Sequence, residues 1–321
     1  MRLDSVCFSW KLFVYLGLMA SLTQCATSFD GSEVSTEADI AKSAEDVAPP
    51  SLTIQDWPSS TTTTARVSIV TIPPNYPIEI AVSDVLRTVA EFATETNALA
   101  VLNGGFFDPN NAQTTSFVTI NGALTADPRE NQRLVGNPDL AEYMDQILNR
   151  SEFRRYHCTD GTRYDITVHQ TAVPDDCELH SALGAGPQLL PQDTSRAEGF
   201  TDYVNGALIR DAIGSQQRNA RSAIGIKQDD SLVWIMAART DAAGGMTLAE
   251  LSDFMKMLGV TKALNLDGGS SSSLYFDQQL MPGLEQRGLP TSEPAMGNQP
   301  VPLRPVKSVL YLSLPQKLTD S

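Results

Sequence analysis

The sequence has few positive charges, and nowhere do they form a stripe. Lys and Arg number 23 against 38 Asp and Glu, which gives a formal net charge of −15 at pH 7. A negative field of this size repels the phosphate backbone of DNA and RNA, so we expect no nucleic acid as a partner. The same field would slow an anionic substrate, so a site for one needs positive groups of its own.

Long apolar runs are also missing, apart from a short one near the start. Residues Leu12 to Leu22 are nearly all apolar, which is too short for a helix that spans a bilayer but suits a secretory signal. We predict a signal at residues 1–26, with a buried N-terminal helix as the alternative. Cys25 stands where a bacterial lipoprotein is lipidated, although Gln24 precedes it instead of a small residue. We therefore expect an exported protein: periplasmic, secreted, or an outer-envelope lipoprotein tethered to the membrane through Cys25.

Cysteine and histidine are scarce. Of the four cysteines, Cys7 lies in the predicted signal, and Cys158 and Cys177 lie in the globular part. In an exported protein this pair predicts a disulfide that closes a surface loop and contributes about 3 kcal/mol. Zinc ligation is the alternative, because all three histidines lie in the same segment. However, no compact Cys-x-x-Cys or His-x-x-x-His spacing occurs, so we predict no metal and no cofactor.

Composition divides the rest of the chain into a linker and one domain. Residues 27–64 are rich in Ser, Thr, Ala, acidic residues and Pro, without apolar periodicity, which predicts a flexible linker. Residues 65–315 contain frequent strand-like runs and hairpin signals, and the polar segment 128–180 is predicted to be an insertion over the core. Strands outnumber helices. This indicates an α+β fold with a mixed, mainly antiparallel sheet and a few packed helices in a single catalytic domain.

Periodicity and turn residues predict the individual elements. Strands are expected at 66–72, 78–82, 98–102, 117–120, 164–169, 222–227, 232–238, 263–266 and 306–312. The clearest helix is 247–258, where Thr247 and Glu250 have capping-box spacing and Gly259 follows the last turn. A second helix is expected after Asp84 as N-cap, and a third at 140–148.

Two apolar strands end in a polar residue and a glycine pair. Residues 98–102 lead into Asn103-Gly104-Gly105, and residues 263–266 lead into Asp267-Gly268-Gly269 and four serines. Glycine lets a ligand approach the backbone closely, so Asp267 would present a carboxylate at a strand end. Taken singly, each segment is also an ordinary turn. Arg221 and Arg239 lie at the open ends of a predicted hairpin, where they could bind a phosphate together or pair with surface carboxylates.

Five segments in order resemble the phosphodiester glycosidase family. They are Asn103–Phe107, Gly184–Leu189, Arg221–Gly225, Gly245–Leu248 and Ala263–Ser270. The resemblance implies hydrolysis of a sugar 1-phosphodiester. It also suggests that Arg221 and Arg239 bind the phosphate while Asp267 acts at the anomeric centre. The residues expected to bind substrate are Asn103, Gly104, Gly105, Asn265, Gly268, Gly269 and Ser270.

The chain departs from the family pattern in places, and two other functions stay open. Ala237 and Ala238 stand before Arg239 where bacterial relatives resemble Asp-Gly, and a third glycine of the family is replaced by Ser270 or shifted. These changes could alter the choice of sugar or the acid–base arrangement. The alternatives are a non-catalytic glycan-binding protein of the cell envelope and a metal-dependent phosphodiesterase. In each case the expected partner is a sugar phosphate or glycan.

Overall fold

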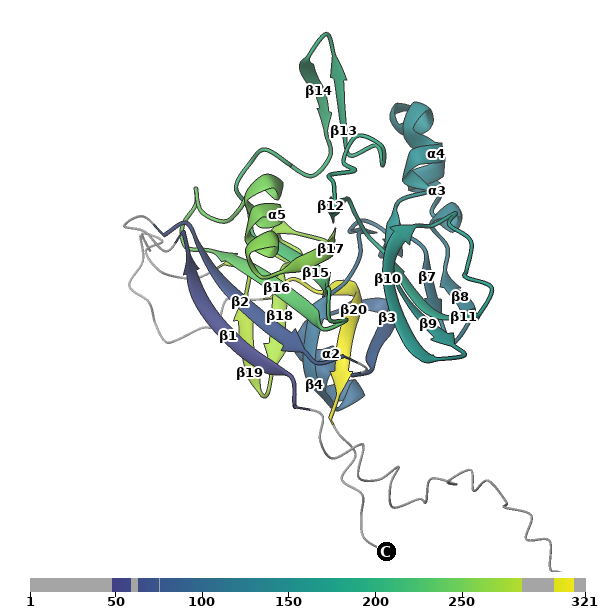
Figure 1. The fold of residues 1–321 in the computed structure, drawn as a ribbon. Helices are drawn as coiled ribbons and strands as arrows, with labels where there is room; N and C mark the ends of the chain where they lie inside the picture. Colours follow the sequence, from purple (N-terminus) through teal and green to yellow (C-terminus); the bar gives the residue numbers. More distant parts are fainter. Residues whose placement is uncertain (1–47, 59–62, 75, 285–302, 315–321) are drawn as a thin grey trace, which may run out of the picture. The chain divides into compact units, whose positions relative to one another are not determined.

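The computed structural model describes residues 48–58, 63–74, 76–284 and 303–314, all within the unit Ala48–Ser321 (Figure 1). The predicted signal, with Cys7 and Cys25, lies outside the described residues. The linker predicted at residues 27–64 extends too far toward the C-terminus. Ser51–Trp57 forms strand β1 and pairs antiparallel with β2 (Ala65–Ile72). The polar composition of β1 concealed it: the strand is mostly exposed and is held by the ladder to β2.

In the described ranges, three larger sheets and two short hairpins contain the strands. The first sheet has the order β1, β2, β16 (Leu232–Arg239), β15 (Arg221–Lys227), β17 (Val260–Asn265), β12 (Gln188–Leu190). The second has the order β19 (Gln279–Pro282), β18 (Ser273–Phe276), β4 (Ala98–Asn103), β20 (Val306–Ser313), β3 (Ile78–Arg87). The third has the order β10 (Gly161–Val168), β9 (Ser151–Cys158), β11 (Cys177–Gly184), β7 (Val118–Ile120), β8 (Ala123–Ala126). The hairpins are β5 (Phe107–Asp108) with β6 (Gln113–Thr114), and β13 (Thr201–Val204) with β14 (Ala207–Asp211).

The ladders between these described strands are antiparallel, as the strand pattern predicted, and the sheets share one core. Trp234 of the first sheet, Leu102 of the second and Phe153 and Ile166 of the third belong to the same cluster of buried side chains. The segment 128–180, predicted to be an insertion over the core, therefore contributes to the core itself. Phe153 of β9 and Ile166 of β10 belong to this core, and Tyr164 of β10 packs against it.

Helix α5 (Leu248–Met257) forms as predicted. The Thr247 side chain and the Glu250 carboxylate make the reciprocal capping-box hydrogen bonds. Leu251 and Phe254 pack against the first sheet on the face away from the shared core, where Figure 1 shows the helix beside β16 and β17. The Trp57 ring of β1 meets Phe254 edge-on at 5.2 Å between ring centroids.

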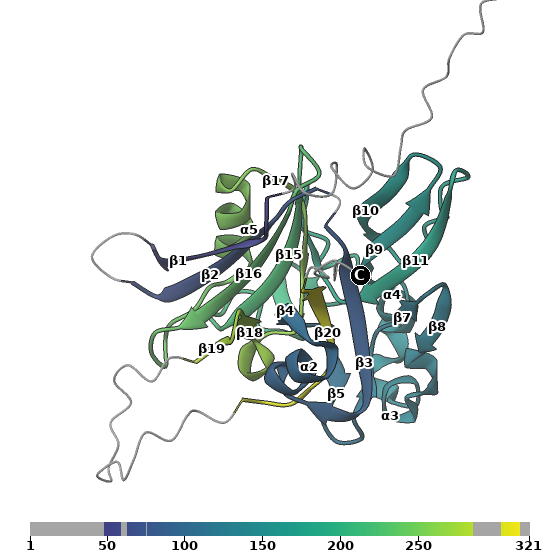
Figure 2. The same cartoon turned by 90° about the horizontal axis from the view of Figure 1, so that it is seen from below.

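The other predicted helices differ from the structure. Helix α2 (Val89–Thr96) begins at Thr88, whose side chain pairs with Glu91 in a capping box, because β3 continues past Asp84 to Arg87. It packs against β4 and β20 of the second sheet (Figure 2). The helix predicted at 140–148 is divided between a 3-10 helix and a single α-turn. The remaining short helices are η1 (Pro128–Glu130), α3 (Gln132–Val135), η2 (Pro138–Tyr143), α4 (Met144–Ile147) and η3 (Gly269–Ser271). Over the described ranges, no helix has the length and apolar character needed to cross a membrane.

Candidate active site

The glycine-marked loops predicted to form a site do meet, at the ends of β4 and β17. The Asp267 N–H donates to the Gly104 carbonyl at 3.0 Å, which joins the loop after β17 to the loop after β4. The Gly186 N–H donates to the Asn265 carbonyl at 2.9 Å and brings in the loop after β11. Segments far apart in the chain, from three different sheets, therefore meet around Asp267.

Gly104 and Gly105 serve packing, not substrate contact. Both are buried, and a Cβ atom on Gly105 would lie 2.2 Å from the Gly184 carbonyl oxygen. A Cβ atom on Gly104 would lie 2.6 Å from the Ser308 hydroxyl. Any larger residue would push these loops apart, so the glycines permit the close approach that positions Asp267.

Asn103 was predicted to bind a sugar hydroxyl, but the structure assigns its side chain another role. The residue is fully buried. Its amide nitrogen donates to the Asp267 carbonyl at 2.7 Å, and its oxygen accepts from the Ser222 hydroxyl at 2.6 Å and the Ser273 N–H at 3.1 Å. Asn103 is thus a positioning residue that fixes the backbone of Asp267.

Asn265 is also buried instead of facing a substrate. Its side-chain nitrogen donates to the Gly186 carbonyl at 2.8 Å, and its backbone N–H donates to the Pro187 carbonyl at 3.0 Å. Among the described residues, its side-chain oxygen has no hydrogen-bond partner. Asn265 was predicted to bind substrate, whereas in the structure its buried side chain holds the loop at Gly186.

The Asp267 carboxyl is half-buried at the end of β17. Burial raises its pKa to about 6, although the Ser271 hydroxyl, the positive charge of Arg304 and the Gly268 N–H all favour the charged form. The Ser271 hydroxyl lies near enough to act on the carboxylate but makes no hydrogen bond of normal geometry with the described residues. A carboxyl with this pKa can take up and release a proton near neutral pH, as acid–base catalysis requires.

Arg221 does not face a ligand site, contrary to the prediction. Only 2% of it is exposed, and its guanidinium donates to backbone carbonyls. The acceptors are Met246 at 3.0 Å, Ile213 at 3.1 Å, Gly214 at 2.6 Å and Gln217 at 2.9 Å. Burial lowers the pKa of Arg221 to about 10, against the opposing charge of Asp211. Arg221 therefore holds the loop at residues 213–217 and is not available for a phosphate clamp.

A cavity of about 200 Å³ is lined by the predicted Arg239 together with Arg304. Its other lining residues include Asn219, Gly269, Ser270 and Ser272. Asp267 is not a lining residue, but the positive charge of Arg304 acts on its carboxyl. We call this cavity the arginine pocket. The Arg239 guanidinium donates to the Asp241 and Ala242 carbonyls, which hold it against its own loop. The Arg304 Nη1 donates to the Ser270 hydroxyl at 2.6 Å, and its guanidinium lies 5.4 Å from the centre of the Phe107 ring.

The predicted residues of the segment Asp267–Ser270 have two different roles: some line the arginine pocket, and one contacts the Asp267 carboxyl. Gly269 and Ser270 line the arginine pocket, and Gly269 has a φ of +61°, which favours glycine. The Gly268 N–H acts on the Asp267 carboxyl. Ser272 also lines the pocket, but its hydroxyl oxygen is fully buried and lacks a hydrogen-bond partner within the described part of the chain.

Arg304 and Asn219 were not predicted. Arg304 stands directly before the last strand, in a polar and proline-rich stretch with no periodicity. The only feature of the sequence that points to Arg304 is its position as a basic residue just before the strand predicted at 306–312. Asn219 precedes the predicted strand at 222–227 without any distinguishing pattern.

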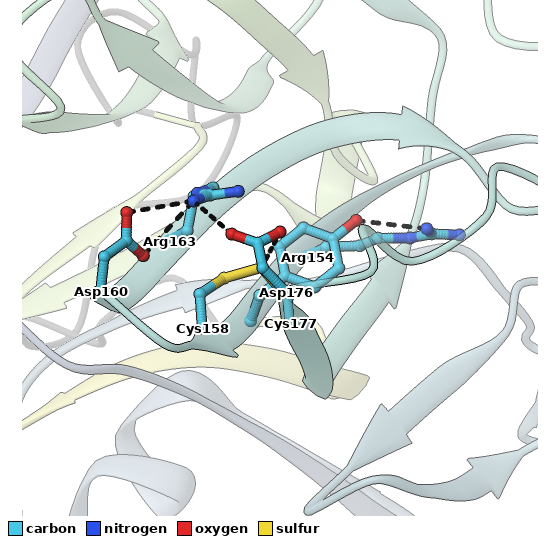
Figure 3. The surroundings of a disulfide bond; sticks show 7 residues. Arg154, Cys158, Asp160, Arg163, Asp176 and Cys177 are labelled. Atoms are coloured by element: carbon cyan, nitrogen blue, oxygen red, sulfur yellow. Dashed lines mark hydrogen bonds and ion pairs between the residues drawn. A yellow bond between two sulfur atoms is a disulfide. The ribbon is translucent and has the colours of Figure 1, made fainter.

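Cys158 and Cys177 form the predicted disulfide at the tips of β9 and β11 (Figure 3). Beside it, Arg163 pairs with Asp160 and Asp176, each at 3.2 Å. Over the described ranges, the side chains close enough to share a metal ion are Cys158, Asp176 and Cys177, and the disulfide occupies both sulfurs. This cluster therefore offers no thiolate ligand.

The histidines of the same segment are engaged elsewhere. His157 and His180 stack with their ring centroids 4.2 Å apart, and His169 hydrogen-bonds Glu152 at 3.0 Å. The three histidines suggested zinc because they lie close together in the sequence. In the structure His169 contacts different residues from His157 and His180.

Comparison with known proteins agrees with the sequence resemblance. The chain is similar to the catalytic domain of zebrafish N-acetylglucosamine-1-phosphodiester alpha-N-acetylglucosaminidase, auto-inhibited by its pro-peptide, with 17% identity, a TM-score of 0.56 and coverage of 83% of both chains. It is also similar to a hypothetical protein from Synechocystis, with 16% identity, a TM-score of 0.52 and coverage of 83% of this chain and 64% of that one. At these identities the structures show a shared fold alone. No curated protein matches the chain.

The family itself is shown by the sequence model for phosphodiester glycosidases, which matches residues 96–313. The matched range includes the loops around Asp267, both arginines of the pocket and the disulfide. The chain belongs to the phosphodiester glycosidase family.

Proposed function

We propose that this protein hydrolyses a sugar 1-phosphodiester at the bond between the anomeric carbon and the phosphate oxygen. The observation that supports this best is the arginine pocket, in which Arg304 acts electrostatically on the Asp267 carboxyl, whose pKa is raised to about 6. Membership of the family agrees with it.

In this proposal the phosphate binds between Arg239 and Arg304. Both side chains line the pocket and both have fixed orientations, one through carbonyls of its own loop and the other through Ser270. Two guanidiniums offset the single negative charge of a phosphodiester, which the net charge of −15 would otherwise repel.

Asp267 acts on the sugar side of the scissile bond. The C1–O bond breaks with its electron pair moving to the phosphate oxygen, and a water oxygen forms the new bond to C1. A phosphate leaves readily as an anion, so the site needs charge neutralisation on the leaving side more than a general acid. Above pH 6 Asp267 is a carboxylate, which either accepts the proton of the attacking water or attacks C1 itself before water replaces it.

Export is part of the same proposal. The apolar run at Leu12 to Leu22 is typical of a signal, and the Cys158–Cys177 disulfide is typical of an oxidising compartment. The substrate would then be a sugar phosphate or glycan outside the cytoplasm.

Steady-state kinetics on a panel of sugar 1-phosphodiesters tests the proposal. Arg239→Gln and Arg304→Gln should each raise KM by roughly tenfold or more, because each removes a charged hydrogen bond to phosphate. Arg87→Gln, on β3 and paired with Glu95, is the matched control and should leave KM unchanged. Binding of these compounds without turnover would favour a glycan-binding protein, and loss of turnover in chelator would favour the metal-dependent phosphodiesterase.

A further inference from the structure

Two arginines outside the arginine pocket, Arg150 and Arg210, are held close together by one loop. The Arg150 Nε donates to the Glu198 carbonyl at 3.1 Å, and the Arg210 Nε donates to the Gly199 carbonyl at 2.9 Å. Consecutive Cα atoms are about 3.8 Å apart, so hydrogen bonds to two consecutive carbonyls bring the guanidiniums near each other. Arg150 follows α4 and Arg210 belongs to β14, and Figure 1 shows that helix beside the β13–β14 hairpin. We call these two side chains the guanidinium pair.

An aromatic ring fixes each member of the pair. The guanidinium carbon of Arg150 lies 3.7 Å from the centre of the Phe200 ring, and that of Arg210 lies 4.5 Å from the centre of the Tyr143 ring. Phe200 is buried, so its ring gives Arg150 a rigid support. A carbonyl and a ring therefore hold each guanidinium in one orientation, which lowers the entropy that a ligand-binding side chain loses on association.

The acidic groups around the pair are engaged with other partners. The Glu198 carboxylate accepts hydrogen bonds from the Ser151 N–H at 2.9 Å and the Ser151 hydroxyl at 2.7 Å. Asp202 accepts from the Tyr143 hydroxyl at 3.1 Å and lies 3.8 Å from Arg196. Within the described part of the chain, neither member of the pair forms an ion pair, although Asp and Glu outnumber Lys and Arg by 38 to 23.

The two positive charges act on each other, and their Nη groups are open to a ligand. Burial lowers the pKa of Arg150 to about 10; the charge of Glu198 opposes this shift, and the charge of Arg210 adds to it. An anion bound to both guanidiniums would relieve that repulsion. The Nη groups of the pair donate to no described residue, and none of them is among the enclosed polar atoms that lack a partner. They therefore reach solvent, where an anion can bind them.

We propose that the guanidinium pair binds a phosphate dianion, either free phosphate or the phosphate monoester of a larger ligand. Two guanidiniums match the two negative charges of such a group, and their Nη edges offer the paired donors that phosphate oxygens accept. A single carboxylate would leave one of the two positive charges without a partner. The pair shares no residue with the lining of the arginine pocket, so this site is additional to the proposed function and does not depend on it.

Calorimetric titration with inorganic phosphate tests the proposal in the full chain carrying Arg239→Gln and Arg304→Gln, which removes the competing arginine pocket. One phosphate should still bind per chain. Adding Arg150→Gln or Arg210→Gln should weaken this binding by roughly tenfold or more, because each change removes a charged hydrogen-bond donor. Arg196→Gln is the matched control: Arg196 lies in the loop that holds the pair, its side chain is 70% exposed, and its replacement should leave the affinity unchanged.

Three results would overturn the assignment: no phosphate binding in the protein that lacks the arginine pocket, unchanged affinity after Arg210→Gln, or acetate binding as tightly as phosphate. Arg210 lies on a surface hairpin, so its variant keeps the test valid if Arg150→Gln does not fold. Glucose 6-phosphate that binds more tightly than inorganic phosphate would support the site and identify a phosphate monoester as its ligand. The reverse order would support the site and identify free phosphate. These titrations involve no turnover, so a failure of the proposed hydrolysis would leave their result unaffected.

Discussion

Replacing Asp267 by Asn should stabilise the fold at alkaline pH while abolishing turnover. Burial raises the pKa of this carboxyl to about 6, whereas its ordinary value is 3.8. A difference of one pKa unit corresponds to about 1.4 kcal/mol, so the ionised carboxyl lowers the free energy of unfolding by about 3 kcal/mol. Asn has nearly the same shape and no charge, which removes this cost.

The sign of the pH dependence follows from proton binding. Below about pH 4 the carboxyl is protonated in both states and contributes no difference. From about pH 4 to 6 the folded protein keeps a proton that the unfolded chain releases, so this carboxyl makes stability fall as pH rises. Above about pH 6 both states are ionised and the cost stays constant. Asp267→Asn should therefore equal the wild type at pH 4 and exceed it by up to about 3 kcal/mol at pH 8.

Urea unfolding at pH 4, 6 and 8 measures this difference. Asp253→Asn, on the exposed face of α5 with a side chain 69% exposed, is the control and should show little change at any pH. Turnover of the Asp267→Asn protein should fall by roughly 100-fold or more, as expected when an acid–base group is removed. A stability difference that does not vary between pH 4 and 8 would refute the raised pKa, and near-normal turnover would refute the catalytic assignment.

Four further results are expected. In a pH–rate profile, wild-type turnover should rise as pH increases through about 6, the pKa of Asp267, because the ionised carboxylate is the active form. A profile that falls over this range would show that the protonated form is active and that Asp267 acts as a general acid. Asn103→Ala should lower the unfolding free energy by about 2–4 kcal/mol in urea titrations, because three buried hydrogen bonds are lost. Arg221→Met should destabilise by about 3 kcal/mol or more yet leave KM of the folded protein unchanged, whereas a large rise in KM would restore Arg221 to the phosphate site. Replacing Cys158 and Cys177 by Ser should cost about 3 kcal/mol in the same titrations, and reductant should have no effect on that variant.

Much of the sheet structure was predictable because its strands are apolar runs bounded by turn residues. The runs at 98–102 and 263–266 correspond to β4 and β17, and each ends within a residue or two of the predicted position. Strand β1 was missed because most of its residues are exposed and lack a buried apolar face, and only pairing with β2 makes it a strand. The start of α2 was misplaced because Asp84 and Thr88 are both acceptable N-caps, and the extension of β3 decides between them.

The candidate site was predictable in position but less so in the role of each residue. Glycine pairs after Asn103 and Asp267 marked two loops that meet through the hydrogen bond from the Asp267 N–H to the Gly104 carbonyl. Gly104 and Gly105 also leave room for Ser308 and Gly184, which pack against them. The burial of Arg221 depends on carbonyls of a loop with no regular pattern, so the sequence did not distinguish it from a ligand-binding arginine. Arg304 belongs to the site through the tertiary position of β20, which no local pattern indicates.

Hydrolysis in water labelled with ¹⁸O tests the proposed function most directly. The protein is incubated with a sugar 1-phosphodiester, and mass spectrometry locates the label in the products. Attack at the anomeric carbon beside Asp267 predicts ¹⁸O in the released sugar and none in the phosphate. Label in the phosphate would show cleavage on the phosphorus side and would contradict the assignment of Asp267 to the anomeric centre.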